Sequence, residues 1–170
     1  PIFFHLYQVS KCHMFFLILG RDGKIWEIEE AYKILKNMKR DFGDKSVLIR
    51  HHPKANKKMK KMLENNFTKY DTSYNSTLLD DITKAEIIIS FSVDANIVCM
   101  LERKKIVFCG EQEADDLTNF GNTFDNLKVV TSIDALSDVI KNLFKSDLKL
   151  DQNYENKLIS IFGDFSLNNI

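Results

Sequence analysis

The chain has 170 residues, of which 44% are hydrophobic and 28% charged, and this composition is typical of one globular domain with a sizeable core. Its 24 basic and 24 acidic residues balance, so no overall electrostatic field draws the protein to nucleic acid. No stretch of ~18 uninterrupted apolar residues predicts a membrane span, and no basic segment precedes the apolar N-terminus as in a signal peptide. We therefore expect a cytoplasmic protein that associates at most peripherally with the inner face of the cell membrane.

Strands and helices are expected to alternate in the first half of the chain. Met14–Leu19 is a predicted strand closed by Gly20, and apolar residues at helical spacing then predict a helix that stops near Gly43. A second apolar strand runs into Arg50 and is followed by a lysine-rich helix over about residues 57–66. A further short strand is expected at Phe67–Tyr70.

The second half repeats the alternation. Thr77 and Asp80 resemble a capping box at the start of a short helix, with Leu78, Leu79 and Ile82 expected to face inward. Three apolar strands are predicted at Glu86–Ser90, Lys105–Gly110 and Leu127–Ser132. Helices are predicted at Ala95–Leu101, after a cap formed by Thr131 and Asp134, and over about residues 152–162. Strands that are apolar on both faces indicate a doubly wound α/β domain with a mostly parallel sheet between helices.

The first candidate site follows the second strand, where the chain reads Arg50, His51, His52, Pro53. In an open α/β sheet, ligands bind beyond the carboxyl ends of the strands. Pro53 biases His52 towards an extended conformation, which would hold the imidazole at the edge of the sheet. Lysines follow in the next helix, so this junction indicates a ligand that carries phosphate. The alternative is that the histidines merely finish a strand and the lysines form a solvated helix face.

Two further loops leave the same ends of later strands. Ser90 and Ser92 precede a helix whose first turn contains Asp94, and their hydroxyls and the helix N-terminus would suit a phosphate. Simple N-capping by the serines explains the same pattern equally well. Glu111 and Glu113 follow the next strand and are candidates to bind ribose or sugar hydroxyls, although a solvated loop is the favoured interpretation.

Several familiar sites are excluded by pattern. The sequence has no GxGxxG, no GxxxxGK[ST] and no GxSxG, which argues against a nicotinamide site, a P-loop and a hydrolase nucleophile. The three cysteines, Cys12, Cys99 and Cys109, form no CxxC pair and no metal-ligand spacing with the four histidines. We therefore expect no metal and no cofactor, and we expect reduced thiols in the core.

The order of motifs resembles the C-terminal, nucleotide-sugar-binding domain of GT-B glycosyltransferases, particularly bacterial capsule and lipooligosaccharide transferases such as sialyltransferases and polysialyltransferases. The resemblance rests on the HP motif at His52 and Pro53, the S-x-S at Ser90 and Ser92, and a TSIDALSDVI-type final helix. It implies that His52 contacts the donor phosphate and that the serines hold phosphate or nucleotide. Catalysis would fall to His52 with Arg50, and donor binding to the remaining candidates, His51, Pro53, Ser90, Ser92, Asp94 and Glu111. The implied reaction is metal-independent transfer of a sugar, with a CMP-linked sialic acid as the first guess at the donor.

The resemblance also sets the domain boundaries and the alternatives. It implies a lead-in segment at 1–13, a Rossmann-like nucleotide-sugar-binding domain at 14–145 and a C-terminal helix and tail at 146–170. Relatives carry Glu-Ala and Gly-Lys-Pro where this chain has Val98-Cys99 and Arg103-Lys104-Lys105. A GT-B enzyme uses a second, N-terminal domain for its glycan acceptor and general base, so this chain is expected to be a half-enzyme that needs that domain or a partner subunit. The alternatives are a non-catalytic α/β module that docks an anionic partner and a sugar-nucleotide epimerase of the same architecture.

Overall fold

The structure is a computed structural model, and it describes residues 13–19, 25–42, 47–53, 55, 57–66, 71–72, 76–109, 123–147 and 153–162. Strands and helices alternate along the described chain, as the sequence predicts. In chain order the elements are β1 (His13–Ile18), α1 (Ile25–Phe42), β2 (Val47–Arg50), α2 (Lys57–Asn66), β3 (Asp71–Thr72), α3 (Leu78–Lys84), β4 (Ala85–Ser90), α4 (Val93–Leu101), β5 (Lys105–Cys109), β6 (Leu127–Val130), α6 (Ile133–Lys145) and α7 (Tyr154–Phe162).

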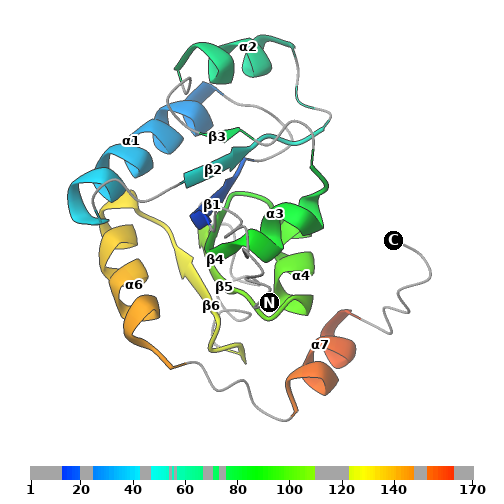
Figure 1. Cartoon of the computed structure of the whole chain (residues 1–170). Helices are drawn as coiled ribbons and strands as arrows, with labels where there is room; N and C mark the ends of the chain where they lie inside the picture. Colours follow the sequence, from blue (N-terminus) through cyan, green and yellow to red (C-terminus); the bar gives the residue numbers. More distant parts are fainter. Residues whose placement is uncertain are drawn as a thin grey trace, which may run out of the picture.

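The strands form one six-stranded sheet in the order β3-β2-β1-β4-β5-β6, and every neighbouring pair is parallel. The chain moves outward from β1 to β2 and β3 and then returns to place β4 on the other side of β1 (Figure 1). This is the doubly wound, Rossmann-like order. The predicted fold class is confirmed.

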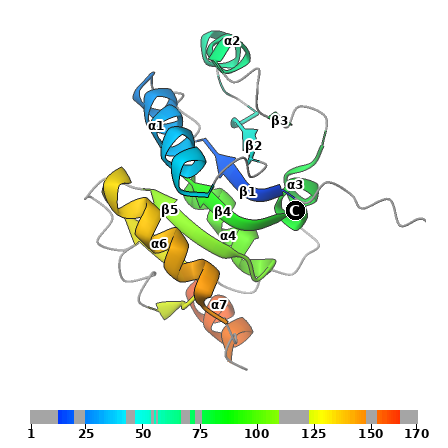
Figure 2. The same cartoon turned by 60° about the vertical axis from the view of Figure 1, so that its left-hand side comes forward.

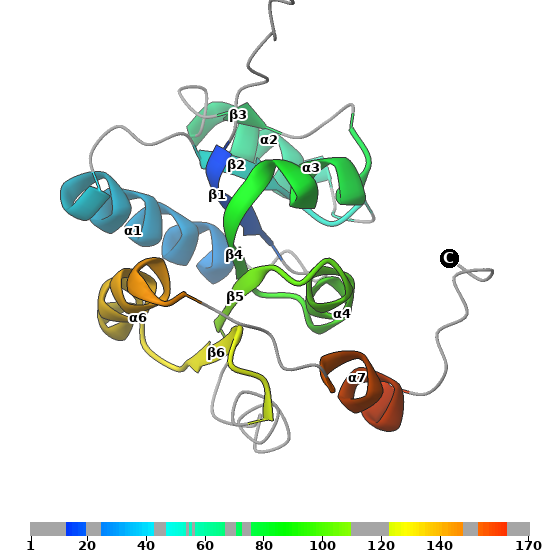
Figure 3. The ribbon, with the colours of Figure 1, turned by 60° about the horizontal axis from the view of Figure 1, so that its bottom comes forward.

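Helices cover both faces of the sheet because the strands are apolar on both faces. On one face, α1 and α6 pack on the inward residues of the first core, such as Leu17, Ile49 and Ile89. On the other face, α3, α4 and α7 pack on the alternate residues of the same strands, such as Ile18, Leu48 and Ile88 (Figures 2 and 3). The period of two along each strand thus divides the apolar residues between two cores.

Two of the helix starts predicted from capping signals are α3 and α6. The capping box is confirmed, since the Thr77 hydroxyl accepts from the Asp80 N–H and the Asp80 carboxylate accepts from the Thr77 N–H. The hydroxyl of Thr77 also donates to this carboxylate, and these bonds hold the pKa of Asp80 below its ordinary value. The cap predicted at Thr131 is wrong, because Ser132 is the N-cap of α6 and accepts from the Asp134 N–H.

The buried side of α3 differs in part from the prediction. Ile82 is buried as predicted, but Leu79, also predicted to face inward, is 47% exposed, and Asp81 is the second buried residue of α3. The predicted stops at Gly20 and Gly43 and the short strand at Phe67–Tyr70 lie outside the described residues.

The last helix packs on the body of the domain. Tyr154 and Leu158 of α7 belong to the second core. The Tyr154 hydroxyl donates to the Met100 carbonyl at 2.9 Å and accepts from Asn126 Nδ2 at 2.9 Å. Burial raises the pKa of the Tyr154 phenol. Within the described residues, no helix is both long enough and apolar enough to cross a membrane.

Candidate functional site

The ends of three strands meet at one edge of the sheet. In the register of the sheet, Ile18 of β1 lies opposite Arg50 of β2 on one side and Ser90 of β4 on the other. Two backbone bonds continue this alignment past the strands, from Leu19 N–H to the Arg50 carbonyl and from Phe91 N–H to the Ile18 carbonyl. The loops after β2 and β4 therefore leave the sheet side by side, flanking β1.

This edge includes the topological switch point of the fold. The connections from β1 and β4 lead in opposite directions along the sheet, and the crevice between two such strand ends is where open α/β domains bind ligands. Sequence reasoning placed the candidate residues at strand ends but did not assign the strand order, so it did not locate this crevice between β1 and β4.

The loop after β2 forms a tight turn at the histidine pair. The Ala55 N–H donates to the His52 carbonyl at 2.9 Å, which closes a four-residue turn with the exposed Pro53 at its second position. His51 Nδ1 lies 2.8 Å from the same carbonyl. Because a carbonyl can only accept, this contact places a proton on Nδ1, and Nε2 becomes the acceptor of the neutral ring. Both imidazoles are half-buried at the rim of the sheet.

Arg50 is held by α3. Its guanidinium Nη1 donates to Asp81 Oδ2 at 2.5 Å and to the Ser76 carbonyl at 3.0 Å, and the Ser76 hydroxyl donates to Asp81 Oδ1 at 2.6 Å. The Asp81 side chain is 2% exposed and the Arg50 side chain 16%. The arrangement supports a structural role for Arg50, because Asp81 offsets much of its charge. Its contact with a departing phosphate stays a prediction.

The loop between β4 and α4 is held by hydrogen bonds from its two serine hydroxyls. Ser92 is the N-cap of α4 and its hydroxyl accepts from the Ala95 N–H at 3.4 Å. Ser90 is fully buried, and its Oγ accepts from the Ser92 N–H and donates to the Ser92 carbonyl, each at 3.0 Å. These bonds fix the loop and aim the N-terminal end of α4 at the edge of the sheet where β1 ends.

Asn96, one turn after the N-cap of α4, is a buried polar residue that sequence reasoning did not single out. It lies one turn into α4 from Ser92 and is only 4% exposed. Neither Nδ2 nor Oδ1 has a hydrogen-bond partner in the structure described here. A buried amide in this state costs about 1–3 kcal/mol, so it calls for an explanation such as a ligand or an ordered water. The signal in the sequence was an amide two positions after Asp94 in the helix VDANIVCML, whose other residues are apolar.

Of the eight predicted site residues, six are described together with their side chains. His51, His52, Pro53, Ser90 and Ser92 come together with Arg50 at the same edge. Asp94 lies in the first turn of α4, and the placement of its side chain is outside what the structure describes. Glu111 lies outside the described residues, although β5 ends at Cys109 on the same edge of the sheet.

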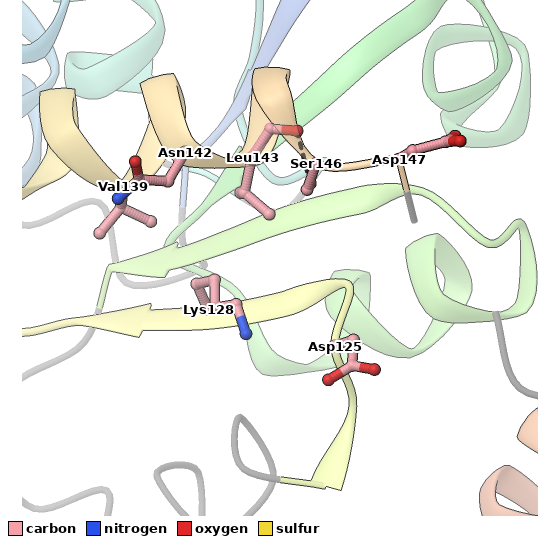
Figure 4. Close-up of a pocket in the computed structure, with 7 residues that line it drawn as sticks. All are labelled: Asp125, Lys128, Val139, Asn142, Leu143, Ser146 and Asp147. Carbon is pink, nitrogen blue, oxygen red and sulfur yellow. Dashed lines mark hydrogen bonds between the residues drawn. The ribbon is translucent and has the colours of Figure 1, made fainter. Parts of the chain in front are cut away.

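Two surface hollows lie away from the crevice. One, of about 500 Å³, lies between β6 and the second half of α6 (Figure 4). It is lined by Asp125, Lys128, Val139, Asn142, Leu143, Ser146 and Asp147. The other, of about 590 Å³, lies between α1 and the start of α6, with Lys33, Lys36 and Arg40 on one wall and Ser132 and Asp134 on the other. No predicted site residue lines either hollow.

The described residues include no group of three or more histidine, cysteine, aspartate or glutamate side chains that could hold a metal ion. The two described cysteines, Cys99 and Cys109, are buried and unpaired by disulfides.

Comparison with known proteins supports the fold. The sequence matches no protein-family model and no curated protein. Two structures of UDP-GlcNAc 2-epimerase from Methanocaldococcus jannaschii are similar in structure. One has a TM-score of 0.65 at 14% identity and matches 91% of this chain. The other, in complex with UDP-GlcNAc and UDP, has a TM-score of 0.62 at 12% identity and matches 88% of this chain.

These likenesses show a shared Rossmann-like fold. The chain spans less than half the length of the two epimerase chains, which are covered to 46% and 44%. The catalytic domain of a cholesterol-α-glucosyltransferase from Helicobacter pylori gives a TM-score of 0.49 at 12% identity over 89% of this chain and 99% of that one, which is too low to carry an argument.

Proposed function

We propose that this chain is the nucleotide-sugar-binding part of a two-domain enzyme and that the nucleotide sugar binds in the crevice between β1 and β4. The observation that carries the proposal is the alignment of Arg50, Ile18 and Ser90 in one row of the sheet. It brings the histidine loop and the N-terminus of α4 to the switch point, where doubly wound folds bind nucleotides.

Different residues of the crevice would bind the phosphate and the nucleoside of such a ligand. The N-terminal dipole and amides of α4 suit a phosphate, and the imidazole of His52 adds a hydrogen-bond donor beside it. His51 Nδ1 already donates to the His52 carbonyl, so His51 would meet the ligand through Nε2, as an acceptor from a hydroxyl. The buried amide of Asn96 is one turn deeper, where a ribose hydroxyl or a base would supply the missing partners. His52 would stabilise the charge that develops on the departing phosphate, as donors aimed at a developing charge do.

At the finer level, we propose metal-independent glycosyl transfer, with sialic acid from a CMP-linked donor and a glycan acceptor of a bacterial surface polysaccharide or lipooligosaccharide. Support for this level comes from the HP and S-x-S motifs and their spacing. The general base and the acceptor site would come from a second domain or a partner subunit.

Epimerisation of a sugar nucleotide is the second candidate function. It is favoured by the likeness to the two epimerase structures, one of which contains UDP-GlcNAc and UDP. The two candidates differ in the nucleotide they need, because an enzyme of the epimerase kind would prefer UDP and a sialyltransferase would prefer CMP.

Calorimetric titration of the chain with CMP, CDP, UDP and GDP tests the proposal. We expect selective binding of one pyrimidine nucleotide, and we expect His52→Ala to weaken it at least tenfold because a donor to the phosphate is lost. His13→Ala is the matched control, since position 13 pairs with Ala85 at the opposite end of the sheet. That variant should bind as the unmodified chain does.

Preference for UDP would favour the epimerase candidate, and preference for CMP the sialyltransferase. If the folded chain binds none of the four nucleotides, the proposal is wrong, and the non-catalytic docking module becomes the better account.

A further inference from the structure

Helix α2 (Lys57–Asn66) concentrates positive charge in a protein whose net charge is zero. Four of its first five residues are lysines: Lys57, Lys58, Lys60 and Lys61. Three of them are exposed and Lys60 is half-buried, with its Nζ 3.5 Å from the Pro53 carbonyl. Among the described residues, no carboxylate forms an ion pair with any of the four. The charge of this helix is therefore not neutralised by the described part of the fold.

The lysines also stand at the wrong end of the helix for its own stability. The N-terminus of a helix carries a partial positive charge, so cations there are unfavourable and acids are favoured. α2 has no acidic residue in its first turn. The N-termini of α3 and α6, by contrast, carry acids in the first turn. Binding of an external anionic surface would offset this repulsion.

The helical spacing gathers these charges on one side. At about 100° per residue, the four lysines fall within an arc of about 160°, while Met59, Met62 and Leu63 fall on the opposite arc in sequence. α2 lies at the periphery of the domain, beyond α1 and the β3 edge of the sheet (Figures 1 and 2). Neither hollow described above is lined by these lysines. The charged face thus lies on a helix at the periphery of the domain.

We propose that α2 binds the surface of an anionic phospholipid bilayer through Lys57, Lys58, Lys60 and Lys61. A peripheral row of charges matches a flat surface of phosphate headgroups, whereas a soluble polyanionic chain would be held better in a groove. Each lysine near such a surface strengthens binding roughly fivefold. The proposal is independent of the nucleotide site, because it uses no residue of the crevice.

Vesicle co-sedimentation of the full chain tests it. We expect binding to vesicles of phosphatidylcholine with phosphatidylglycerol, no binding to phosphatidylcholine alone, and loss of binding at high salt, where charges are screened. The variant Lys57→Gln/Lys58→Gln/Lys61→Gln should bind roughly a hundredfold more weakly. The matched control, Lys84→Gln/Lys141→Gln/Lys145→Gln, removes the same charge from exposed positions of α3 and α6 and should bind within about threefold of the unmodified chain.

Three results would overturn the proposal: no binding of the unmodified chain to anionic vesicles at low salt, equal losses in the two triple variants, or binding to soluble polyphosphate without binding to vesicles. The last would assign α2 to a soluble polyanion instead. Circular dichroism of each variant establishes that its helices are intact, and glutamine suits an exposed helical position about as well as lysine.

Discussion

The ion pair of Arg50 and Asp81 joins the end of β2 to α3, which leads directly into β4. Both carboxylate oxygens of Asp81 are bonded, one to Arg50 and one to the Ser76 hydroxyl. A buried pair adds little over well-packed apolar residues, but removal of one partner leaves a charge without compensation. The pair therefore fixes how the two sides of the crevice lie relative to each other.

Asp81→Asn should lower the free energy of unfolding by about 3 kcal/mol, because Arg50 would keep its charge in a nearly buried position. Urea denaturation measures the change. Asp138→Asn, an exposed aspartate on α6, is the control and should change stability by less than about 0.5 kcal/mol. A loss below 1 kcal/mol for Asp81→Asn would contradict this account of the pair. The double change Arg50→Met/Asp81→Leu should recover much of the loss.

Cys99 and Cys109 are buried thiols of the core. Burial raises the pKa of Cys99 and of Cys109 to about 12. Each thiol is therefore protonated in the folded state at any pH below that value, and a thiol in this state is a poor nucleophile.

In the native chain at pH 8, iodoacetamide should modify Cys99 and Cys109 far more slowly than in the unfolded chain, because both accessibility and thiolate are lacking. Peptide mass spectrometry measures each cysteine separately. Since the folded pKa lies above the ordinary value of 9.0, these thiols contribute stability that is present below pH 9 and lost as the pH rises from 9 to about 12. Rapid modification of either cysteine in the folded protein would show that the core around it is open.

α4 is followed by a non-glycine residue in a left-handed conformation. Arg103 adopts a left-handed conformation with φ of 53°. Its N–H donates to the Met100 carbonyl at 2.9 Å, and the Lys104 N–H donates to the Cys99 carbonyl at 3.0 Å. These are the two bonds of a Schellman motif, in which the left-handed position is usually glycine. Arg103 also pairs with Glu155 of α7 at 2.5 Å, but both side chains are more than half exposed.

Arg103→Gly should raise the free energy of unfolding by about 0.5–1 kcal/mol, because glycine enters the left-handed region without the steric cost of a Cβ. The exposed ion pair with Glu155 contributes little that would be lost. Arg103→Ala is the matched control, since it removes the ion pair but keeps the Cβ. If the glycine variant is less stable than the alanine variant in thermal or urea unfolding, the strain assigned to Arg103 is absent.

Helices and strands were predictable because their signals are local. The capping box at Thr77 and the lysine-rich helix at 57–66 follow from neighbouring residues, and the structure has both. The error at Leu79 has a non-local cause: Asp81 is buried beside Ile82 because Arg50, 31 positions earlier, neutralises its charge. An aspartate alone gives no sign of such a partner.

The candidate site was only partly predictable for the same reason. The histidines and serines stand out at the ends of apolar strands, and the sheet brings them to one edge. Their neighbourhood depends on the strand order β3-β2-β1-β4-β5-β6, which alternation of elements does not specify. Asn96 was missed because its meaning comes from burial in the finished fold, where it is 4% exposed.

At the scale of the whole molecule, the residues that stabilise the fold lie on the two faces of the sheet, and the candidate binding residues lie at one edge of it. Two cores lie on opposite faces of the sheet, and helices close both. Polar loops collect at the carboxyl edge, where the switch between β1 and β4 opens a crevice. At the opposite edge of the sheet, Lys104, just before β5, donates to the Ala85 carbonyl at the start of β4, and Lys105, the first residue of β5, donates to the Leu143 carbonyl in the last turn of α6. The carboxyl edge is thus left for a ligand.

Amide chemical-shift mapping of the ¹⁵N-labelled chain, titrated with UDP-GlcNAc and with CMP-sialic acid, locates the nucleotide-sugar site residue by residue. The account predicts that one ligand shifts the amides of Leu19, His51, His52 and residues 91–96, while those of Lys128 and Asn142 beside the hollow of Figure 4 stay in place. Shifts centred on that hollow, or no shifts with either ligand in a folded chain, would contradict a nucleotide-sugar site between β1 and β4.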